Sequence, residues 1–413
     1  MRHGRYSLLR SAKRGWRVNR KILIVGAGIG GLTAALALQR RGFEVEVYEQ
    51  ADHLGDIGAG LQLSPNAVKV LGALGLSAGL DAIGVEPEGK TIRLWNSGET
   101  WPLFDLGGVS RDRYGAPYLM IHRGDLQGLL VDAVRRQHPD AIRLGARFDA
   151  MEPSDDTVTL HFEDGRRATG SLGVGADGVH SRLRSVLFGS DKPAFTGCMA
   201  WRGVIPAARL SPHLRDPIGT NWVGPGRHVI QYPLRRGELV NFVGVVERDD
   251  WTVETWTARG TREECAQDFD GWHADVQELI GNLDRPFKWA LLGREPMTRW
   301  SSGRATLLGD ACHPMLPFMA QGAAMAIEDG IVLARCLAAD TDLAAALARY
   351  ENARIDRTTR VVRAAARNRD LFHDSRLADA LDAQRYVDRN WAEDQVKARY
   401  EWLFAYDPVD GPI

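Results

Sequence analysis

The chain has 413 residues, of which 44% are hydrophobic and 25% charged, and this composition is typical of a soluble protein with two or more domains. Its formal net charge of −1 gives no electrostatic reason to bind nucleic acid. No apolar run reaches the roughly 18 to 20 residues of a membrane helix. The widely spaced cysteines predict neither a zinc site nor a disulfide framework, so we expect a cytoplasmic protein without a metal, with cysteines at Cys198, Cys265, Cys312 and Cys336.

The first predicted elements follow a basic arm over residues 1–20, which contains no acid and to which we assign no function. An apolar, β-branched run over 21–25 predicts a buried strand. A glycine-rich turn leads from it into a helix that ends near Arg41. A second strand is predicted over 44–49.

The glycine-rich turn has the spacing of a dinucleotide-binding fingerprint. Gly26 permits the tight bend, Gly28 lets a pyrophosphate approach the backbone, and Gly31 lets the helix pack closely on the strand. Glu49, about 20 residues beyond the glycines, is placed to hydrogen-bond an adenosine ribose. Together, the strands, turn, helix and terminal acid predict a dinucleotide site.

The middle of the chain mixes two kinds of pattern. A glycine-rich loop over 56–66 precedes a short amphipathic helix over 67–74, and a hairpin is predicted over 91–106. A helix then runs from His122 to about Gln137. We assign the hairpin to a different layer from the helices.

Strands dominate the next part of the chain. A hairpin over 157–174 is followed by Asp177-Gly178 at a strand-to-helix turn, which suits a ligand contact and equally an ordinary turn. Short strands recur from Cys198 to Val246 and predict a mostly antiparallel sheet.

The last predicted strand, over 304–308, ends in Gly309-Asp310. An irregular loop over 311–319 and a helix from about Gly322 to Ala339 follow, and the chain from Leu343 to Tyr400 is predicted to be helical. The predicted fold class is therefore α/β, with a Rossmann-like domain interleaved with a mostly antiparallel sheet domain and followed by a helical C-terminal segment.

Three separate stretches together resemble the single-component FAD-dependent aromatic hydroxylases, a family that includes salicylate hydroxylase and 3-hydroxybenzoate 6-hydroxylase. These stretches are the fingerprint with Glu49, the Asp177-Gly178 pair, and Gly309-Asp310-Ala-Cys-His313-Pro314. The resemblance implies a discontinuous FAD-binding domain over 21–90, 107–190 and 290–340, a substrate domain over 91–106 and 191–289, and a helical region over 341–413.

The resemblance also implies residue roles and a reaction. Asp310 would contact the flavin ribityl chain, Arg123 would lie against FAD, and Asp177-Gly178 would serve both FAD and the nicotinamide nucleotide. NADH or NADPH would be a transient reductant, since the chain carries one dinucleotide fingerprint. A flavin 4a-hydroperoxide would transfer oxygen from O2 to a small aromatic substrate. The helix that begins near Gln321-Gly322 would point its positive end at the flavin pyrimidine. Gln321 would contact the flavin or substrate, or equally cap its helix, and His313-Pro314 would form a wall of the flavin site.

His228 and Tyr232 are the predicted catalytic pair. In a strand, residues i, i+2 and i+4 share a face, so His228, Ile230 and Tyr232 point the same way. A histidine is the natural base for a phenol near neutral pH. Relatives similar to 3-hydroxybenzoate 6-hydroxylase have this His-x-x-x-Tyr spacing in the substrate pocket, which supports the interpretation.

Several substrates stay open at this stage. We place salicylate first, hydroxylated with loss of its carboxylate, and 3-hydroxybenzoate second. A hydroxypyridine acid such as 6-hydroxynicotinate is less favoured, because relatives that use it carry histidines where this chain has Gln62 and Phe318. The pattern also allows a hydroxylase or epoxidase of a larger natural product, or a non-catalytic binding protein. Arg93 and Arg202 are candidates to bind a carboxylate, and we expect a monomer or homodimer that binds neither nucleic acid nor membrane.

Overall fold

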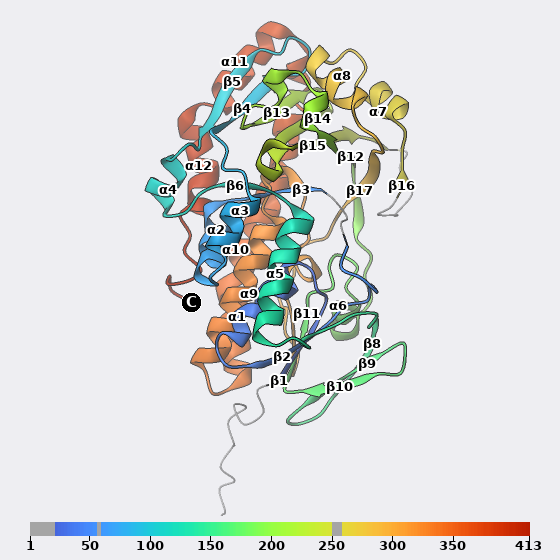
Figure 1. The fold of residues 1–413 in the computed structure, drawn as a ribbon, viewed down its shortest axis with the longest axis vertical. Coiled ribbons are helices and arrows are strands. Elements are labelled where there is room, and N and C mark those ends of the chain that lie inside the picture. Colours follow the sequence, from blue (N-terminus) through green and yellow to red (C-terminus); the bar gives the residue numbers. More distant parts are fainter. Residues whose placement is uncertain (1–20, 56–58, 250–257) are drawn as a thin grey trace, which may run out of the picture.

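The computed structural model describes residues 21–55, 59–249 and 258–413. The predicted basic arm and residues 56–58 of the predicted glycine-rich loop lie outside this part of the chain. A parallel sheet and a larger, mostly antiparallel sheet lie at opposite ends of the molecule, and helices run between them (Figure 1). The predicted fold class is confirmed.

The parallel sheet has five strands in the order β18-β11-β1-β2-β7. Helix α1 (Ile29–Gln39) packs against both α5 (Arg123–Gln137) and α9 (Gly322–Ala339), and every residue of α1 is buried. The strands are β1 (Lys21–Val25), β2 (Glu44–Tyr48), β7 (Ile142–Arg143), β11 (Leu172–Gly175) and β18 (Ala305–Leu307). Strands about 280 residues apart in the chain therefore belong to one sheet.

The larger sheet has eight strands in the order β16-β17-β12-β15-β14-β13-β4-β5. Its neighbours pair antiparallel except for β13 and β4, which are parallel. The strands are β4 (Gly89–Leu94), β5 (Thr100–Asp105), β12 (Ala194–Pro206), β13 (Ile218–Gly224), β14 (Arg227–Leu234), β15 (Leu239–Glu247), β16 (Ala258–Arg259) and β17 (Phe287–Gly293).

The two faces of this sheet have different partners. On the outer face Trp201, Trp222 and Val229 belong to a core cluster shared with α7 (Arg262–Asp268) and α8 (Ala274–Gly281). On the inner face Tyr232 and the neighbouring valines join the main core of the molecule. Because side chains alternate along a strand, His228 and Tyr232 lie on the inner face.

Two small sheets complete the strands of the described residues. β3 (Gly60–Leu63) pairs with β6 (Leu119–His122) between the two large sheets, and β8 (Phe148–Pro153), β9 (Val158–Phe162) and β10 (Arg167–Gly170) form a three-stranded sheet. The hairpin predicted over 157–174 is wrong beyond residue 170. The backbone N–H and hydroxyl of Ser171 both donate to the Lys21 carbonyl, at 2.8 and 2.9 Å, and the chain turns there into the parallel sheet as β11.

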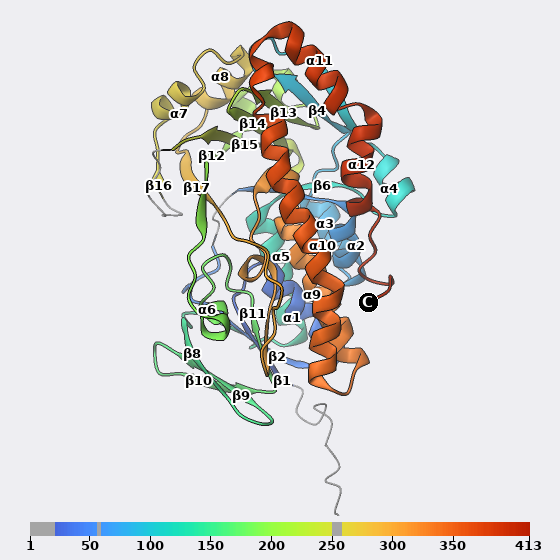
Figure 2. The same cartoon turned by 180° about the vertical axis from the view of Figure 1, so that it is seen from behind.

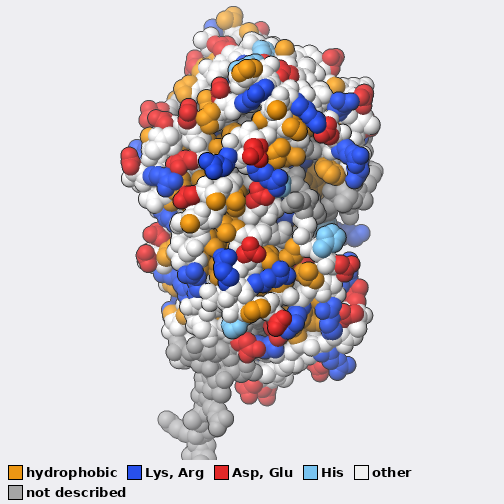
Figure 3. Space-filling view, viewed as in Figure 1, with side chains coloured by type: hydrophobic (Ala, Val, Ile, Leu, Met, Phe, Trp, Pro, Cys, Tyr) orange, Lys and Arg blue, Asp and Glu red, His pale blue; other side chains and the backbone are white. Residues whose placement is uncertain are grey.

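The C-terminal region is helical, as predicted. α10 (Leu343–Phe372) runs along the back of the molecule from the parallel sheet to the antiparallel sheet (Figure 2). No helix in the described ranges is both long and apolar enough to cross a membrane. Basic and acidic side chains are interspersed on the face shown in Figure 3. The remaining helices are α2 (Pro65–Ala73), α3 (Ser77–Ile83), α4 (Val109–Tyr114), α6 (Arg182–Phe188), α11 (Ala380–Asn390) and α12 (Glu393–Phe404).

Candidate functional site

The three fingerprint glycines differ in what surrounds them. Gly26 has φ +106°, and a Cβ there would lie 2.4 Å from the Ala176 carbonyl oxygen. A Cβ on Gly31 would lie 2.1 Å from the Gly26 carbonyl oxygen, so packing within the protein already requires glycine at both positions. A Cβ on Gly28 would meet no protein atom within 4 Å. The open space above Gly28, at the N-terminus of α1, is the place where a bound phosphate fits.

Glu49 is held over this turn by the backbone. Its carboxylate accepts hydrogen bonds from the Ala27 N–H at 2.8 Å and from the Ala51 N–H at 3.0 Å. Each carboxylate oxygen has a second lone pair, so the group can still accept a bond from a ribose hydroxyl.

Arg123 and Asp310 lie near each other beyond the turn. Burial lowers the pKa of Arg123, while the charges of Asp310 and Glu49 oppose this shift. Among the described residues no protein group hydrogen-bonds the Arg123 guanidinium. Asp310 lies deep in the molecule but has an open surface, because it lines a cavity of about 140 Å³. Burial raises the pKa of Asp310, and a Cβ on Gly322 would lie 4.0 Å from its Oδ1.

Two predicted cofactor residues use their side chains within the protein. Asp177 accepts hydrogen bonds from the Ser181 hydroxyl at 2.5 Å and from the N–H groups of Arg182 and Leu183 at 2.8 and 3.0 Å, so it closes the start of α6. Gly178 has φ +76°, and a Cβ there would meet no atom within 4 Å. The backbone of Gly178 is therefore open to a ligand, whereas the Asp177 carboxylate already accepts three hydrogen bonds from the protein.

Gln321 is the second such residue. Its amide donates to the Ser64 hydroxyl at 2.9 Å, and its amide oxygen accepts from Asn66 at 3.4 Å. The side chain makes no hydrogen bond to the first turn of α9. It therefore ties α9 to the β3–α2 junction.

A buried ionic network holds the Gly309-Asp310 loop against α9. Asp329 accepts hydrogen bonds from the Gly309 N–H at 2.9 Å, from His313 at 2.6 Å and from Arg354 at 2.7 Å. Arg354 also pairs with Glu328 at 2.6 Å. Burial alone would raise the pKa of Asp329, but the charges of His313 and Arg354 bring it to about 2. Cys312, His313 and Asp329 also have atoms that could bind a metal, within 4.8 Å of one another. Both oxygens of Asp329, however, already accept the hydrogen bonds from Gly309, His313 and Arg354.

This network was not predicted from the sequence. The signal for it was the adjacent pair Glu328-Asp329 inside an otherwise apolar helix, because two carboxylates on a buried helix require cationic partners. The arginines that supply the charge, Arg354 and Arg357, lie on α10 and have no local motif.

His228 is completely buried and is hydrogen-bonded on one side only. Its Nδ1 lies 2.6 Å from His373 Nε2, and its Nε2 has no hydrogen-bond partner among the described residues. The ring meets Phe318 edge-on, with centroids 5.1 Å apart. Burial, with a smaller contribution from His373, lowers the pKa of His228 well below its usual value. The imidazole is therefore neutral at physiological pH.

Tyr232 has different surroundings from His228. A Cβ on Gly60 would lie 2.6 Å from the Tyr232 ring, so β3 passes close against it. Burial raises the pKa of Tyr232, while the charge of Arg202 opposes the shift. Tyr232 lies four positions after His228, which is about 14 Å along β14. The two side chains share a face, as predicted, but they contact different neighbours.

The two arginines predicted as candidates to bind a carboxylate differ in whether an acidic partner already pairs with them. Arg93 pairs with Asp275 at 2.7 Å and stacks on Trp222 at 4.0 Å, so its charge is already neutralised. Arg202 lies 4.4 Å over the Trp289 ring and lines the same cavity as Asp310. No carboxylate pairs with Arg202 in the described part of the chain, and burial lowers its pKa.

Lys90 is a buried cation that sequence reasoning missed. Its Nζ donates to Gln62 Oε1 at 2.9 Å, and the Tyr118 hydroxyl donates to the same oxygen at 2.7 Å. Within the described ranges it has no carboxylate partner, and burial lowers its pKa to about 8. Lysines are rarely buried without a partner, but nothing in the alternation of β4 distinguishes an inward lysine from a solvated one.

Comparison with known proteins decides the family. A family model described as an FAD binding domain matches residues 19–365. The chain belongs to this FAD-binding family. It is 41% identical over 388 residues to 3-amino-4-hydroxybenzoate 2-monooxygenase PtnB3 of Streptomyces platensis. The aligned residues cover 94% of this chain and 96% of the relative. It is 39% identical over 400 residues to 6-hydroxynicotinate 3-monooxygenase of Pseudomonas fluorescens. The aligned residues cover 95% of this chain and 96% of that relative.

A solved structure gives the same assignment. The crystal structure of Klebsiella pneumoniae HpxO complexed with FAD and uric acid superposes with a TM-score of 0.80 at 30% identity, over 91% of this chain and 96% of that chain. The protein is therefore an FAD-dependent aromatic monooxygenase, and the predictions of an enzyme and of FAD as its cofactor are confirmed.

Proposed function

We propose that this FAD-dependent monooxygenase hydroxylates a one-ring aromatic acid whose ring hydroxyl lies opposite its carboxylate, with NADH or NADPH as the reductant. One observation carries the proposal. Arg202 and His228 lie on the same face of the antiparallel sheet, and each has unused binding capacity. Arg202 would bind the carboxylate, and the free Nε2 of His228 would accept the proton of the hydroxyl.

The register of the sheet supports opposite substituents. Arg202 pairs with Val243, which pairs with Ile230, so Arg202 lies two strands away from β14 and two residues along from His228. With strands about 4.8 Å apart and a rise of about 3.4 Å per residue, the two Cα atoms are about 12 Å apart. A ring with substituents on opposite sides suits this separation better than salicylate, whose hydroxyl and carboxylate are adjacent.

The names of both relatives point the same way. 3-Amino-4-hydroxybenzoate and 6-hydroxynicotinate each carry a hydroxyl on the ring position opposite the carboxylate.

FAD would be held along the whole length of the parallel-sheet domain. Gly26, Gly28, Gly31 and Glu49 would bind its adenosine and pyrophosphate, and Arg123, Asp310 and Gly322 would contact its flavin end. Bound FAD supplies the redox chemistry, taking reducing equivalents from NAD(P)H and activating oxygen. Gly178 would offer backbone groups to the visiting nicotinamide nucleotide.

The protein's own contribution is to orient the ring and make it electron-rich. Arg202 would fix the carboxylate, and His228 would remove the hydroxyl proton so that the ring reacts as the phenolate. Phe318, whose ring meets that of His228 edge-on, would keep water from the reacting groups. Tyr232 would bind the ring from the side of β3.

A substrate screen tests the proposal. NAD(P)H consumption and product formation would be measured for 4-hydroxybenzoate, 3-amino-4-hydroxybenzoate and 6-hydroxynicotinate, and compared with salicylate and 3-hydroxybenzoate. We expect coupled product only with acids of the first group. Preferential hydroxylation of salicylate would refute the assignment of the two ends of the site.

Variants then separate the roles of the two residues. Arg202→Gln should raise KM about tenfold to a hundredfold, because a charged hydrogen bond is worth roughly 1.5 to 3 kcal/mol. Arg93→Gln, whose parent guanidinium is already paired with Asp275, should leave KM unchanged. His228→Ala should keep FAD and oxidise NAD(P)H, but ring hydroxylation should fall roughly 10²- to 10⁴-fold and hydrogen peroxide should be released instead. An unchanged ratio of product to NAD(P)H would exclude His228 as the base.

A further inference from the structure

We propose that His228, His373 and Glu247 form a proton relay that connects the substrate's ring hydroxyl to solvent. The proposal rests on the proposed function, since it follows the proton that His228 accepts. The base lies in a closed site, with no exposed surface and with phenylalanine rings beside it. A proton taken up there requires an exit.

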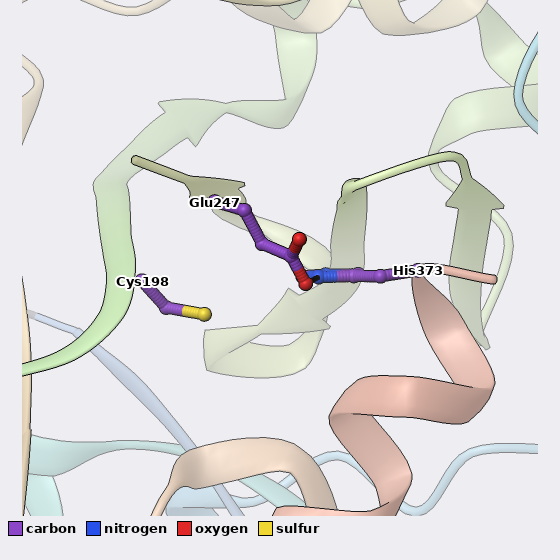
Figure 4. Close-up of side chains that lie close together, drawn as sticks. All are labelled: Cys198, Glu247 and His373. Carbon is purple, nitrogen blue, oxygen red and sulfur yellow. Dashed lines mark hydrogen bonds and ion pairs between the residues drawn. The ribbon is translucent and has the colours of Figure 1, made fainter. Parts of the chain in front are cut away.

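The three groups form a continuous hydrogen-bonded chain across two elements of the fold. His228 Nδ1 lies 2.6 Å from His373 Nε2, and His373 Nδ1 lies 2.8 Å from Glu247 Oε1. His373 directly follows the last residue of α10, and Glu247 is the last residue of β15. Figure 4 shows the imidazole of His373 pointing at the Glu247 carboxylate. The His373 side chain is 2% exposed and that of Glu247 is 47% exposed, so the chain runs from the interior to solvent.

The carboxylate at the outer end determines the tautomers of both rings. An ionised carboxylate only accepts, so His373 Nδ1 carries the hydrogen and its Nε2 carries a lone pair. That lone pair accepts from His228 Nδ1–H, which leaves His228 Nε2 without a hydrogen. Nε2 is the buried atom that has no partner. The chain thus presents a bare lone pair to the place where the substrate hydroxyl would bind.

The surroundings keep the outer end ionised. The hydrogen bond from His373 lowers the pKa of Glu247, with a smaller contribution from the charge of Arg369 on α10. Cys198 on β12 faces the same group (Figure 4), and burial raises the pKa of its thiol to about 12, so it stays protonated. Asp370 lies near Cys198. The rings of Phe318 and Phe372 lie beside His228, and its partners on the neighbouring strands are Val223 and Val245.

The proton count closes over one turnover. When the bound phenol ionises, its proton passes to His228 Nε2, the Nδ1 proton passes to His373 Nε2, and the Nδ1 proton of His373 passes to Glu247 and then to water. Hydroxylation releases the hydrogen of the attacked ring carbon as a proton, and this proton restores the neutral hydroxyl of the product. The second oxygen atom of O2 leaves as water, and its formation requires the proton that the phenol lost. The same hops in reverse supply that proton and restore both starting tautomers. No other reactant is needed.

The first test needs no substrate. In holoenzyme carrying ¹⁵N-labelled histidine, the nitrogen shifts report which ring atom bears hydrogen. We expect both His228 and His373 to carry it on Nδ1. Hydrogen on Nε2 of His228 would overturn the relay, whatever the enzyme's substrate is.

The second test measures the proton itself. 4-Hydroxy-3-nitrobenzoate has the proposed substituent pattern, and its phenolate absorbs visible light. The probe is mixed with the holoenzyme in weak buffer that contains a pH indicator. The absorbance of the phenolate then reports ionisation of the phenol, and the absorbance of the indicator reports release of the proton to solvent. His373→Gln keeps an acceptor for His228 and a donor for Glu247 but cannot pass a proton. In this variant the probe should bind with unchanged affinity, and proton release should slow roughly 10²-fold.

Controls distinguish the relay from a structural role. Glu247→Gln should slow release as well, whereas Glu238→Gln, at an exposed position beside the opposite end of β15, should not. In His373→Ala, added imidazole should restore fast release through the half-exposed end of the chain. Wild-type release rates in His373→Gln would refute the relay. Failure of the probe to bind wild-type enzyme would instead refute the proposed substrate class, and the tautomer measurement would then decide the relay alone.

Discussion

Replacing Lys90 by methionine should stabilise the folded protein at neutral pH. Burial lowers the pKa of Lys90 from 10.5 to about 8. One pKa unit corresponds to about 1.4 kcal/mol, so holding this charge in the folded protein at pH 7 costs about 3 kcal/mol relative to the unfolded chain. Methionine removes the charge and the hydrogen bond to Gln62, whose oxygen keeps Tyr118 as a donor. We expect a net gain of about 1 to 3 kcal/mol.

The gain should depend on pH in a specific direction. Between about pH 8 and pH 10.5 the unfolded chain keeps the Lys90 proton while the folded protein has lost it. The unfolded state then binds more protons, so the stability contributed by this site rises with pH. The difference between Lys90→Met and wild type should therefore be largest below pH 8 and should vanish near pH 10.5.

Urea unfolding of the holoenzyme, followed by tryptophan fluorescence from pH 7 to pH 10 at a fixed FAD concentration, measures this difference. Lys192→Met is the matched control, because Lys192 is exposed and its loss should change little. If wild type and Lys90→Met keep a constant difference across this range, the charge of Lys90 is not what the variant removes, and the argument from burial fails.

Three further predictions concern FAD and the network beneath it. Gly28→Val should fold normally but purify colourless, because its side chain enters space that only the pyrophosphate uses. The control Gly31→Val should fail to fold. Full flavin content in Gly28→Val would contradict the placement of FAD. Asp310→Ala should weaken FAD about tenfold to a hundredfold by loss of a charged hydrogen bond, as measured by flavin fluorescence titration. Arg354→Met should lower the free energy of unfolding by about 3 to 5 kcal/mol, because it removes the cation that bridges two fully buried carboxylates and leaves Glu328 with Arg357 and Asp329 with His313. Arg349→Met, at a partly exposed pair, should cost less than about 1 kcal/mol.

Local patterns were enough to predict much of the fold. The strand, turn and helix from residue 21 to Gln39 and the helix Gly322–Ala339 are continuous segments whose signals lie within their own residues. The change of sheet at Ser171 was missed because the group that turns the chain is the Lys21 carbonyl, 150 residues away. A hydrophobic run predicts a strand, but it does not say which sheet the strand joins.

The functional site shows the same limit, because local patterns do not reveal contacts between distant parts of the chain. His228 was predicted as the base from its place on a strand, but His373 lies 145 residues further along the chain and Glu247 has no motif of its own. Asp177 and Gln321 were predicted to contact the cofactor, and the structure turns both side chains to protein partners. A motif predicts that a residue lies near a ligand, whereas the direction of its side chain depends on neighbours supplied by tertiary contacts.

The strand order of the parallel sheet also governs how this protein can be made. Strand β1 leaves the ribosome about 280 residues before β18, which completes the sheet on the far side of β11. At a synthesis rate of 5 to 20 residues per second, this delay is on the order of 15 to 60 s. Strand β11 itself emerges about 130 residues before β18, so for on the order of 7 to 26 s it presents an unpaired edge, which is a hazard for aggregation. Asp310 and α9 emerge later still, so the predicted FAD site is complete only after about three quarters of the chain has been synthesised.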